Sequence, residues 1–329
     1  MNILADFREK AKKMKGTIVL PESTDLRTLK ATEAILKENI SKVILVGNEN
    51  VIVQVASENS VNIQNARIID PDRYEKIDDF ADFYFHKRKK KGITKEEANM
   101  IVRNPLYFGT LLVKFDIVNG MVAGAATATA EVLRAALQIV GVAPGLKTVS
   151  STFIMVTSHF EEDKVFLFSD CAVVPNPDAE QLADISISSA KTRRKLLGDE
   201  PKVALLSFST KGSAEHELID KVLETKTILD NRNVDFDYDG ELQLDAAIIP
   251  AIANKKAPDS KVAGNANVLI FPDLQAANIG YKLVQRFSNT EAIGPIIQGL
   301  AAPICDLSRG CSWKDIYNTA ALVLLISQR

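Results

Sequence analysis

The chain has 329 residues and a formal net charge of −2, so neither nucleic acid nor an anionic membrane is an expected electrostatic partner. It is 46% hydrophobic and 25% charged, which is the composition of a globular protein, and its length predicts two domains. No apolar run is long enough for a membrane-spanning helix, and the first 16 residues are too charged for a signal peptide, so we expect a cytoplasmic enzyme.

Short apolar runs alternate with helical patterns along the chain. Strands are predicted at 16–22, 42–47, 164–170, 202–209 and 267–273, and helices at 25–38, 178–196, 214–229 and 274–286. Apolar β-branched strands separated by helices are typical of a parallel sheet covered on both faces, so the predicted fold class is α/β. A Gly/Pro turn at 141–151 is the best domain boundary, and the apolar last helix, 313–328, is expected to pack on the first domain.

Two nucleotide-binding motifs are absent. The segment 141–148, GVAPGLKT, has three residues between Gly141 and Gly145, and Leu146 stands before Lys147, so it does not have the spacing of a P-loop. No G-x-G-x-x-G occurs either, which removes the usual nicotinamide fingerprint.

Metal ligands are also scarce in the sequence. Five residues separate Cys305 from Cys311, which is too many for a zinc clip, and the histidines are scattered at His86, His159 and His216. With Cys171, the three cysteines fit free thiols in a reducing compartment. We therefore expect no metal site, and a carboxylate is at least as good a candidate for a general base as a histidine.

The basic run 86–92 carries five lysines and arginines. It is either a solvated helix end, where cations complement the helix dipole, or a patch for a ligand that carries phosphates. Thr94 and Glu97 directly after it have the spacing of a capping box that opens a new helix.

Small residues, hydroxyls and an arginine alternate in the segment 124–138. Either Thr127 or Thr129 is expected to be the N-cap of a helix, whose free amides would suit an anion. Arg134 lies one to two turns into that helix among apolar residues, so it either faces solvent or reaches a ligand.

The segment 305–316, CDLSRGCSWKDI, joins a strand-like run to the last helix. Ser312 and Asp315 form a capping box for that helix. Ser308 and Arg309 stand before it, where a parallel sheet would end and where open α/β proteins place their ligands. Because an arginine fork fits phosphate and carboxylate, these residues alone predict an anion site with a carboxylate base nearby.

Many stretches, in order over nearly the whole chain, resemble the phosphate acetyltransferase family; among them are NPDAEQLADISISSAKT, NVLIFPDLQAANIGYKLVQR and GPIIQGLAAPICDLSRGCSWKDI. The related phosphate butyryltransferases match the final segment less well. The resemblance implies the two-domain, three-layer α/β/α architecture of isocitrate and isopropylmalate dehydrogenases. The first domain would comprise 1–147 plus 298–329 and the inserted second domain 148–297, with the active site in the cleft and a homodimer formed through the inserted domain.

The resemblance also implies a reaction, acetyl-CoA + phosphate ⇌ acetyl phosphate + CoA, with CoA as a substrate and no cofactor. Its partners are therefore small molecules. Asp315 would deprotonate the CoA thiol, whose sulfur attacks the acetyl carbonyl directly. Ser308 would hydrogen-bond near the thiol or the developing oxyanion, Arg309 would hold the phosphoryl group, and Arg134 and Arg88 would bind CoA. A thiol needs modest help from a carboxylate, whereas a dianionic leaving group needs fixed cations.

The segment 124–129, GAATAT, departs from the pattern G-A-x-H-[ST]-T of many family members. Thr127 stands at the usual histidine, Ala128 at a usual hydroxyl, and Ala135 at a common proline after the arginine. These departures leave open a preference for a longer acyl group. Further substrate contacts are expected from Thr127, Thr129, Ser150 and Ser151.

Two other functions compete with acetyl transfer. A non-catalytic protein that binds CoA or acetyl phosphate could use the same scaffold, but Ser308, Arg309 and Asp315 are all present. A decarboxylating dehydrogenase is disfavoured, because the sequence has neither a nicotinamide motif nor a cluster of metal-binding carboxylates.

Overall fold

The computed structural model describes residues 3–157, 164–288 and 290–328. The chain divides into two compact units, which we name by their place in the sequence. The terminal unit is Asn2–Ala143 with Leu300–Arg329, and the central unit is Pro144–Gly299. Each unit has its own sheet, so the chain is a mixed α/β protein with two sheets in which parallel pairing dominates. In the part of the chain that is described, no helix has the length and apolar character needed to cross a bilayer.

The sheet of the terminal unit is parallel throughout its described strands and has the order β11-β4-β1-β2-β3. Its strands are β1 (Thr17–Leu20), β2 (Lys42–Val46), β3 (Arg67–Ile69), β4 (Gly120–Ala123) and β11 (Ile304–Asp306). The predicted strands at 16–22 and 42–47 are confirmed. Because β11 comes from the end of the chain, the sheet is completed only when the C-terminal segment returns to it.

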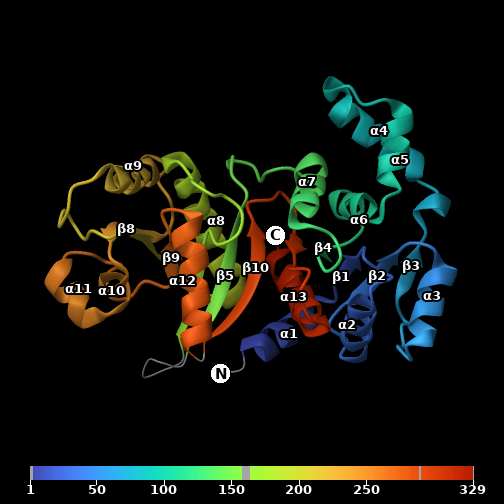
Figure 1. The fold of residues 1–329 in the computed structure, drawn as a ribbon, viewed down its shortest axis with the longest axis horizontal. Coiled ribbons are helices and arrows are strands. Elements are labelled where there is room, and N and C mark those ends of the chain that lie inside the picture. Colours follow the sequence, from blue (N-terminus) through green and yellow to red (C-terminus); the bar gives the residue numbers. More distant parts are fainter. Residues whose placement is uncertain (1–2, 158–163, 289, 329) are drawn as a thin grey trace. The chain divides into compact units, whose positions relative to one another are not determined.

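Helices cover both faces of this sheet. The helices are α1 (Ile3–Met14), α2 (Leu26–Lys37), α3 (Glu49–Glu58), α4 (Ile77–Arg88), α5 (Lys95–Val102), α6 (Pro105–Lys114), α7 (Thr129–Ile139) and α13 (Trp313–Ile326), with short 3₁₀ turns η1 (Pro71–Arg73) and η2 (Lys89–Lys91). Helices α4 to α7 share one core cluster with Val19, Ile44 and Met121 of the sheet. The last helix, α13, packs beside α1 and α2 on the terminal unit (Figure 1), as the sequence predicts.

The central unit has a mixed sheet of order β10-β5-β6-β9-β7-β8. Its strands are β5 (Ser150–Thr157), β6 (Lys164–Ser169), β7 (Lys202–Leu206), β8 (Asp237–Leu242), β9 (Val268–Ile270) and β10 (Glu291–Gln298). The parallel prediction is wrong for one neighbour of β6, because β6 pairs antiparallel with β5 and parallel with β9. A parallel partner needs a crossover of a dozen or more residues, and the connection from Thr157 to Lys164 is too short for one.

The helices of the central unit also lie on both faces of their sheet. They are α8 (Ala179–Leu197), α9 (Glu217–Asn231), α10 (Leu244–Ile248), α11 (Pro250–Lys256) and α12 (Leu274–Phe287). Residues of α8 and α9 pack with Leu167 and Val203 in one core cluster, whereas residues of α10 to α12 pack with Phe168 and Leu206 in another. The predicted helices at 178–196 and 274–286 are confirmed.

Candidate functional site

Three loops leave neighbouring strands at the carboxyl edge of the terminal unit's sheet. They are 21–25 after β1, 124–128 after β4 and 307–312 after β11, which are adjacent in the order β11-β4-β1. The register pairs Ile304 with Met121 and Asp306 with Ala123, both parallel, so Ser308 and Arg309 follow a strand at the edge where open α/β proteins bind ligands.

Glu22 holds the middle loop in place. Its carboxylate accepts hydrogen bonds from three consecutive backbone amides, at 2.8 Å from Ala125, 3.0 Å from Ala126 and 2.7 Å from Thr127. Successive amides that point to one spot form an anion-binding concavity, and here the protein's own carboxylate occupies it. A substrate anion is therefore better placed at the neighbouring loop.

The N-cap prediction for α7 is wrong. The N-cap is Ala128, which offers no side-chain hydrogen bond, and Thr129 is the first helical residue. The amide of Thr127 is already bonded to Glu22, and the Thr129 side chain hydrogen-bonds to Asp306. The backbone of Thr127 and the side chain of Thr129 are thus held by residues that belong to other strands or the loops after them.

Asp306 is a functional candidate that the sequence analysis missed. It is 1% exposed at the end of β11, and its Oδ1 has no hydrogen-bond partner among the described residues. Burial raises its pKa to about 6, with the charge of Glu22 adding to the rise and the Thr129 hydrogen bond opposing it. Asp306 therefore titrates close to neutral pH beneath the loop that carries Ser308. A carboxylate between the apolar Cys305 and Leu307 is the sequence signal that could have indicated it.

The predicted catalytic residues follow Asp306 in the chain. Ser308 and Arg309 lie in the loop after β11, and Asp315 lies in the first turn of α13. Ser308 and Arg309 are exposed, and the Ser308 hydroxyl accepts a 3.3 Å hydrogen bond from the Gly310 amide. Within the described chain no acceptor engages the Arg309 guanidinium. Asp315 forms the predicted capping box, because its Oδ2 accepts from the Ser312 amide at 2.7 Å and the Ser312 hydroxyl at 2.9 Å. Its Oδ1 has no bond to any described residue and remains available.

The structure brings Arg88 and Arg134 to the same tyrosine. Arg134 is exposed on α7, Arg88 ends α4, and Tyr107 lies on α6 between them in sequence. Burial raises the pKa of the Tyr107 hydroxyl, and both guanidinium groups oppose that rise by their charge. Two cations from separate helices thus act on one hydroxyl, and such a pair suits a ligand with more than one phosphate.

Another residue of the basic run, Lys87, serves the local structure. The Lys87 ammonium donates a 2.6 Å hydrogen bond to the Ile139 carbonyl at the end of α7, which ties α4 to that helix. The run ends at Gly92, whose φ of +86° favours glycine, and the predicted capping box of Thr94 and Glu97 opens α5.

Ser150 and Ser151 lie on β5 of the central unit, and both are 0% exposed. The Ser150 hydroxyl accepts a 3.0 Å hydrogen bond from the Gln298 side chain. The Ser151 hydroxyl donates to Asp170 Oδ1 at 2.5 Å. Since both hydroxyls have partners inside the unit, Ser150 and Ser151 are weaker candidates for substrate contacts.

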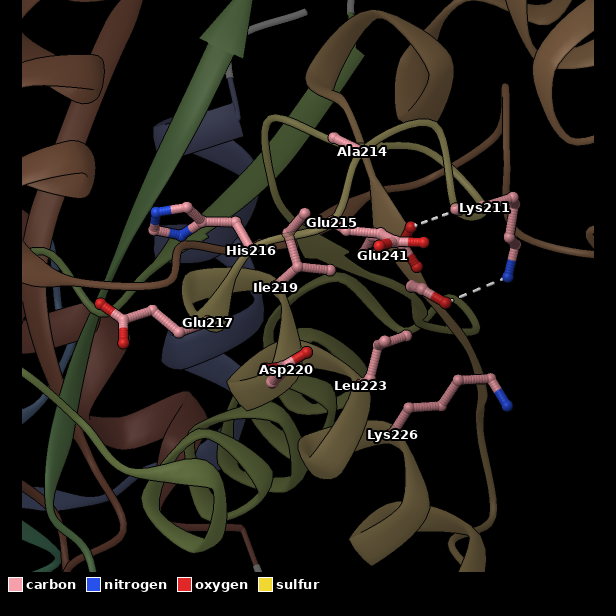
Figure 2. Close-up of a pocket in the computed structure, with 12 residues that line it drawn as sticks. Lys211, Ala214, Glu215, His216, Glu217, Ile219, Asp220, Leu223, Lys226 and Glu241 are labelled. Carbon is pink, nitrogen blue, oxygen red and sulfur yellow. Dashed lines mark hydrogen bonds between the residues drawn. The ribbon is translucent and has the colours of Figure 1, made fainter.

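The central unit has a pocket of about 790 Å³ beside the loop from β7 to α9 (Figure 2). Glu241, only 2% exposed, accepts hydrogen bonds from the Gly212 amide at 2.7 Å and the Ser209 hydroxyl at 3.1 Å. Lys211 is paired with Asp239. The hydrogen-bond donors of Gly212 and Ser209 and the ammonium of Lys211 thus already have partners within the protein. The other charged residues that line the pocket are mostly acidic, so this pocket is a weaker candidate for a phosphate site.

Metal binding has no support in the described residues, where no group of histidine, cysteine and carboxylate side chains is arranged to hold an ion. His159 lies outside the described residues. Cys171 and Cys305 are buried, Cys311 is half-buried, and all three are free thiols.

The family model described as phosphate acetyl/butaryl transferase matches residues 2–324. The chain belongs to this family. It is 53% identical over 330 residues to the phosphate acetyltransferase of Thermoanaerobacterium thermosaccharolyticum, with 100% of each chain covered. A solved phosphotransacetylase from Streptococcus pyogenes has a TM-score of 0.93 at 40% identity and covers 99% of this chain and 98% of its own.

The fold is shared beyond the family. A 4-hydroxythreonine-4-phosphate dehydrogenase from Klebsiella pneumoniae has a TM-score of 0.53 at 12% identity, and the match covers 95% of this chain and 100% of that one. This likeness concerns the fold alone, and it relates this phosphate acetyl/butaryl transferase family member to a dehydrogenase scaffold.

Proposed function

We propose that the chain is a phosphate acetyltransferase that catalyses acetyl-CoA + phosphate ⇌ acetyl phosphate + CoA. The observation that carries the proposal is the 53% identity to a phosphate acetyltransferase over the full length of both chains. The site geometry agrees with it, since the segment 308–315 presents a hydroxyl, a guanidinium and a carboxylate; among the described residues the guanidinium has no acceptor, and one carboxylate oxygen has no donor.

In the proposed mechanism Arg309 binds the phosphoryl group of acetyl phosphate. Asp315 Oδ1 removes the thiol proton of CoA, and the sulfur attacks the acetyl carbonyl. Ser308 donates a hydrogen bond to the oxyanion that develops there. The bond from carbon to the phosphate oxygen then breaks, and phosphate leaves with the electron pair, stabilised by Arg309. No acyl-enzyme is formed.

CoA is proposed to bind through its phosphates at Arg88 and Arg134. The support is their convergence on Tyr107 and the exposure of Arg134. Thr127 is proposed to line the same region, because its backbone is fixed by Glu22 while its side chain is half-buried. Thr129 is exposed and bonded to Asp306, so it is proposed to act on the loop beside the substrates.

We also propose the three-layer α/β/α architecture of isocitrate and isopropylmalate dehydrogenases, with domains 1–147 plus 298–329 and 148–297. Helices on both faces of each sheet and the likeness to a dehydrogenase support it. The division of the chain at Ala143 and Gly299 agrees with these boundaries to within a few residues.

A homodimer through the central unit is part of the proposal. Ile279, Leu283 and Phe287 are spaced four residues apart on α12 and are 57%, 50% and 86% exposed, so they form one apolar stripe. A second copy of the chain would bury it. Sedimentation of the Phe287→Glu variant tests this: a wild-type dimer that becomes monomeric supports the interface, and an unchanged dimer rejects it.

The decisive experiment mixes the purified protein with CoA and acetyl phosphate and follows thioester absorbance. Rapid thioester formation is expected. Butyryl phosphate in parallel reactions tests the longer acyl preference that the GAATAT segment left open. No thioester with any acyl phosphate would overturn the enzyme proposal.

A further inference from the structure

Arg27 occupies the junction of the three loops at the candidate site. It is the second residue of α2 and follows the N-cap Asp25. Its Nη1 donates to the carbonyls of Arg309 at 2.7 Å and Cys311 at 3.1 Å. Its Nη2 donates to the Ala125 carbonyl at 2.6 Å, so one guanidinium holds backbone from two different loops.

Asp25 fixes the orientation of this guanidinium. Its Oδ1 accepts from Arg27 Nε at 3.0 Å and its Oδ2 from Nη2 at 2.7 Å, which is a two-point ion pair. The hydrogen bond from the Arg27 side chain is the main cause that lowers the pKa of the Asp25 carboxyl. Asp25 also caps α2 through the Arg27 amide at 2.8 Å, so the pair is attached firmly to the sheet edge.

Arg27 differs from a substrate-binding arginine in how many of its hydrogen-bond donors are already used. A guanidinium has five N–H donors. Arg27 makes five hydrogen bonds to Asp25 and to the three backbone carbonyls, so no donor is left for a phosphate. Arg309, in contrast, is exposed and its guanidinium has no acceptor among the described residues.

Glu22 completes the arrangement from the same segment of chain. It accepts the amide of Ala125 while Arg27 binds the carbonyl of that residue, so Ala125 is held on both sides. The carbonyls of Arg309 and Cys311 flank Gly310 and precede the capping box that carries Asp315. A change at Arg27 would therefore move the backbone between Arg309 and Asp315.

We propose that Arg27 is a positioning residue for acetyl transfer, which sets the backbone of 309–311 and thereby the directions of the Arg309 and Asp315 side chains without touching a substrate. The proposal rests on the function proposed above. Lysine cannot replace Arg27, because a single ammonium cannot reach Asp25, Ala125 and Arg309 with the geometry of a planar fork.

The test compares Arg27→Ala and Arg27→Lys with a matched control, Arg103→Ala. Arg103 also bonds a carboxylate and a backbone carbonyl, at Asp72 and Pro71, but it ends α5. Both Arg27 variants should lose about 10²-fold in kcat, as expected for reacting groups displaced by about 1 Å, with little change in the KM for CoA. Added guanidinium ion should restore part of the kcat of Arg27→Ala. It should not raise the kcat of Arg103→Ala.

Two kinetic results would overturn the proposal. One is a loss confined to the KM for acetyl phosphate and phosphate, which would make Arg27 a substrate ligand. The other is full kcat in Arg27→Lys. Hydrogen exchange of the amides in 305–316 provides a readout that does not need activity: faster exchange in Arg27→Ala than in Arg103→Ala supports the positioning role, and equal exchange rejects it. If the wild-type protein makes no thioester, the proposed function fails, and the exchange result alone decides whether Arg27 orders the loop.

Discussion

At the carboxyl edges of the two sheets, a glutamate carboxylate orders a loop by accepting its hydrogen bonds. The two edges differ in whether a cation remains without a partner. In the terminal unit Glu22 accepts the amides of one loop, and in the central unit Glu241 accepts the Gly212 amide and the Ser209 hydroxyl of another. The cation of the central loop, Lys211, is bound to Asp239 and to the Gly240 carbonyl. In the terminal unit, Arg27 donates the hydrogen bonds that hold the loop backbone, at the carbonyls of Arg309 and Ala125. The Arg309 guanidinium has no partner among the described residues.

This difference suggests how to recognise the site. Glu22 and Glu241, with the loop amides that they accept, have their hydrogen-bond partners in both units, as buried polar groups in proteins generally do. A cation that remains exposed and unpaired after those bonds are made is available to an anionic substrate. By this criterion the loop after β11 is a better candidate for binding phosphate than the loop after β7.

The largest effect is expected from Arg309→Ala. Removal of the guanidinium should lower kcat/KM for acetyl phosphate by about 10²- to 10³-fold, because the charge of the leaving phosphate is then uncompensated. Lys211→Ala is the matched variant in the central unit and should cost far less, since that ammonium is already paired. Initial rates at varied acetyl phosphate measure both.

Two outcomes would break the comparison between the loops. Equal losses in the two variants would mean that the central loop also binds the substrate. A selective loss of CoA affinity in Arg309→Ala would mean that the roles of Arg309 and of the pair Arg88 and Arg134 are exchanged.

Asp315→Asn should have the next largest effect. Asparagine can still accept the hydrogen bonds from Ser312, so α13 keeps its start, but it cannot take a thiol proton. Turnover should fall about 10²-fold or more, in the range of a lost general base, while CoA binding measured by calorimetry stays near the wild-type value. Wild-type turnover in this variant would reduce Asp315 to a helix cap.

The sequence predicts the parts of this site that depend on local spacing. The capping boxes at Thr94 and Ser312 follow from residues three apart, and the structure confirms both. Arg27 and Glu22 could not be found in this way, because their partners are 282 residues away at Arg309 and 103 residues away at Ala125. Those contacts exist only because β11, β4 and β1 are neighbours in the sheet.

The same reason explains what the sequence got wrong. Thr127 and Thr129 have the composition of an N-cap, but Glu22, after β1, binds the backbone amide of Thr127, and Asp306, on β11, interacts with the side chain of Thr129. The strand predicted at 164–170 is present as β6, but the expectation of parallel pairing failed on its β5 side, because a strand's pattern does not specify its neighbours. Sequence spacing predicts elements and caps, whereas strand order decides which loops meet.

A third prediction concerns the stability contributed by Asp306. Its pKa in the folded protein, about 6, is above the ordinary 3.8, so the fold binds the proton more tightly than the unfolded chain does. The resulting stability is complete below pH 3.8 and is lost as the pH rises through about 6, and the shift corresponds to at most about 3 kcal/mol.

Asp306→Asn should remove this pH dependence, because the amide does not ionise. Urea unfolding at about pH 4 and about pH 7 should show the wild-type protein losing more stability between the two than the variant. Ser308 and Arg309 are unchanged in this variant, so the measurement isolates the buried carboxyl. The same pH dependence in both proteins would contradict the raised pKa.

The smallest expected effect comes from the start of α7. Side-chain N-caps begin α2, α3, α5, α6 and α13 of the terminal unit and α8, α9 and α12 of the central unit, whereas the N-cap of α7 is Ala128, which has none. Ala128→Ser supplies the missing acceptor and should raise the free energy of unfolding by about 1 kcal/mol, and Thr94→Ala should lower it by a similar amount.

Both variants lie in the terminal unit, and the activity of Ala128→Ser shows whether its missing cap belongs to the site. If Ala128→Ser is more stable and equally active, the missing cap is only an unoptimised helix end. If it is more stable but slower, the uncapped amides beside the Glu22 loop belong to the site, and stability was given up there for function. No gain in stability would mean that the loop held by Glu22 keeps the new hydroxyl away from the first turn, so that strand order again outweighs local sequence.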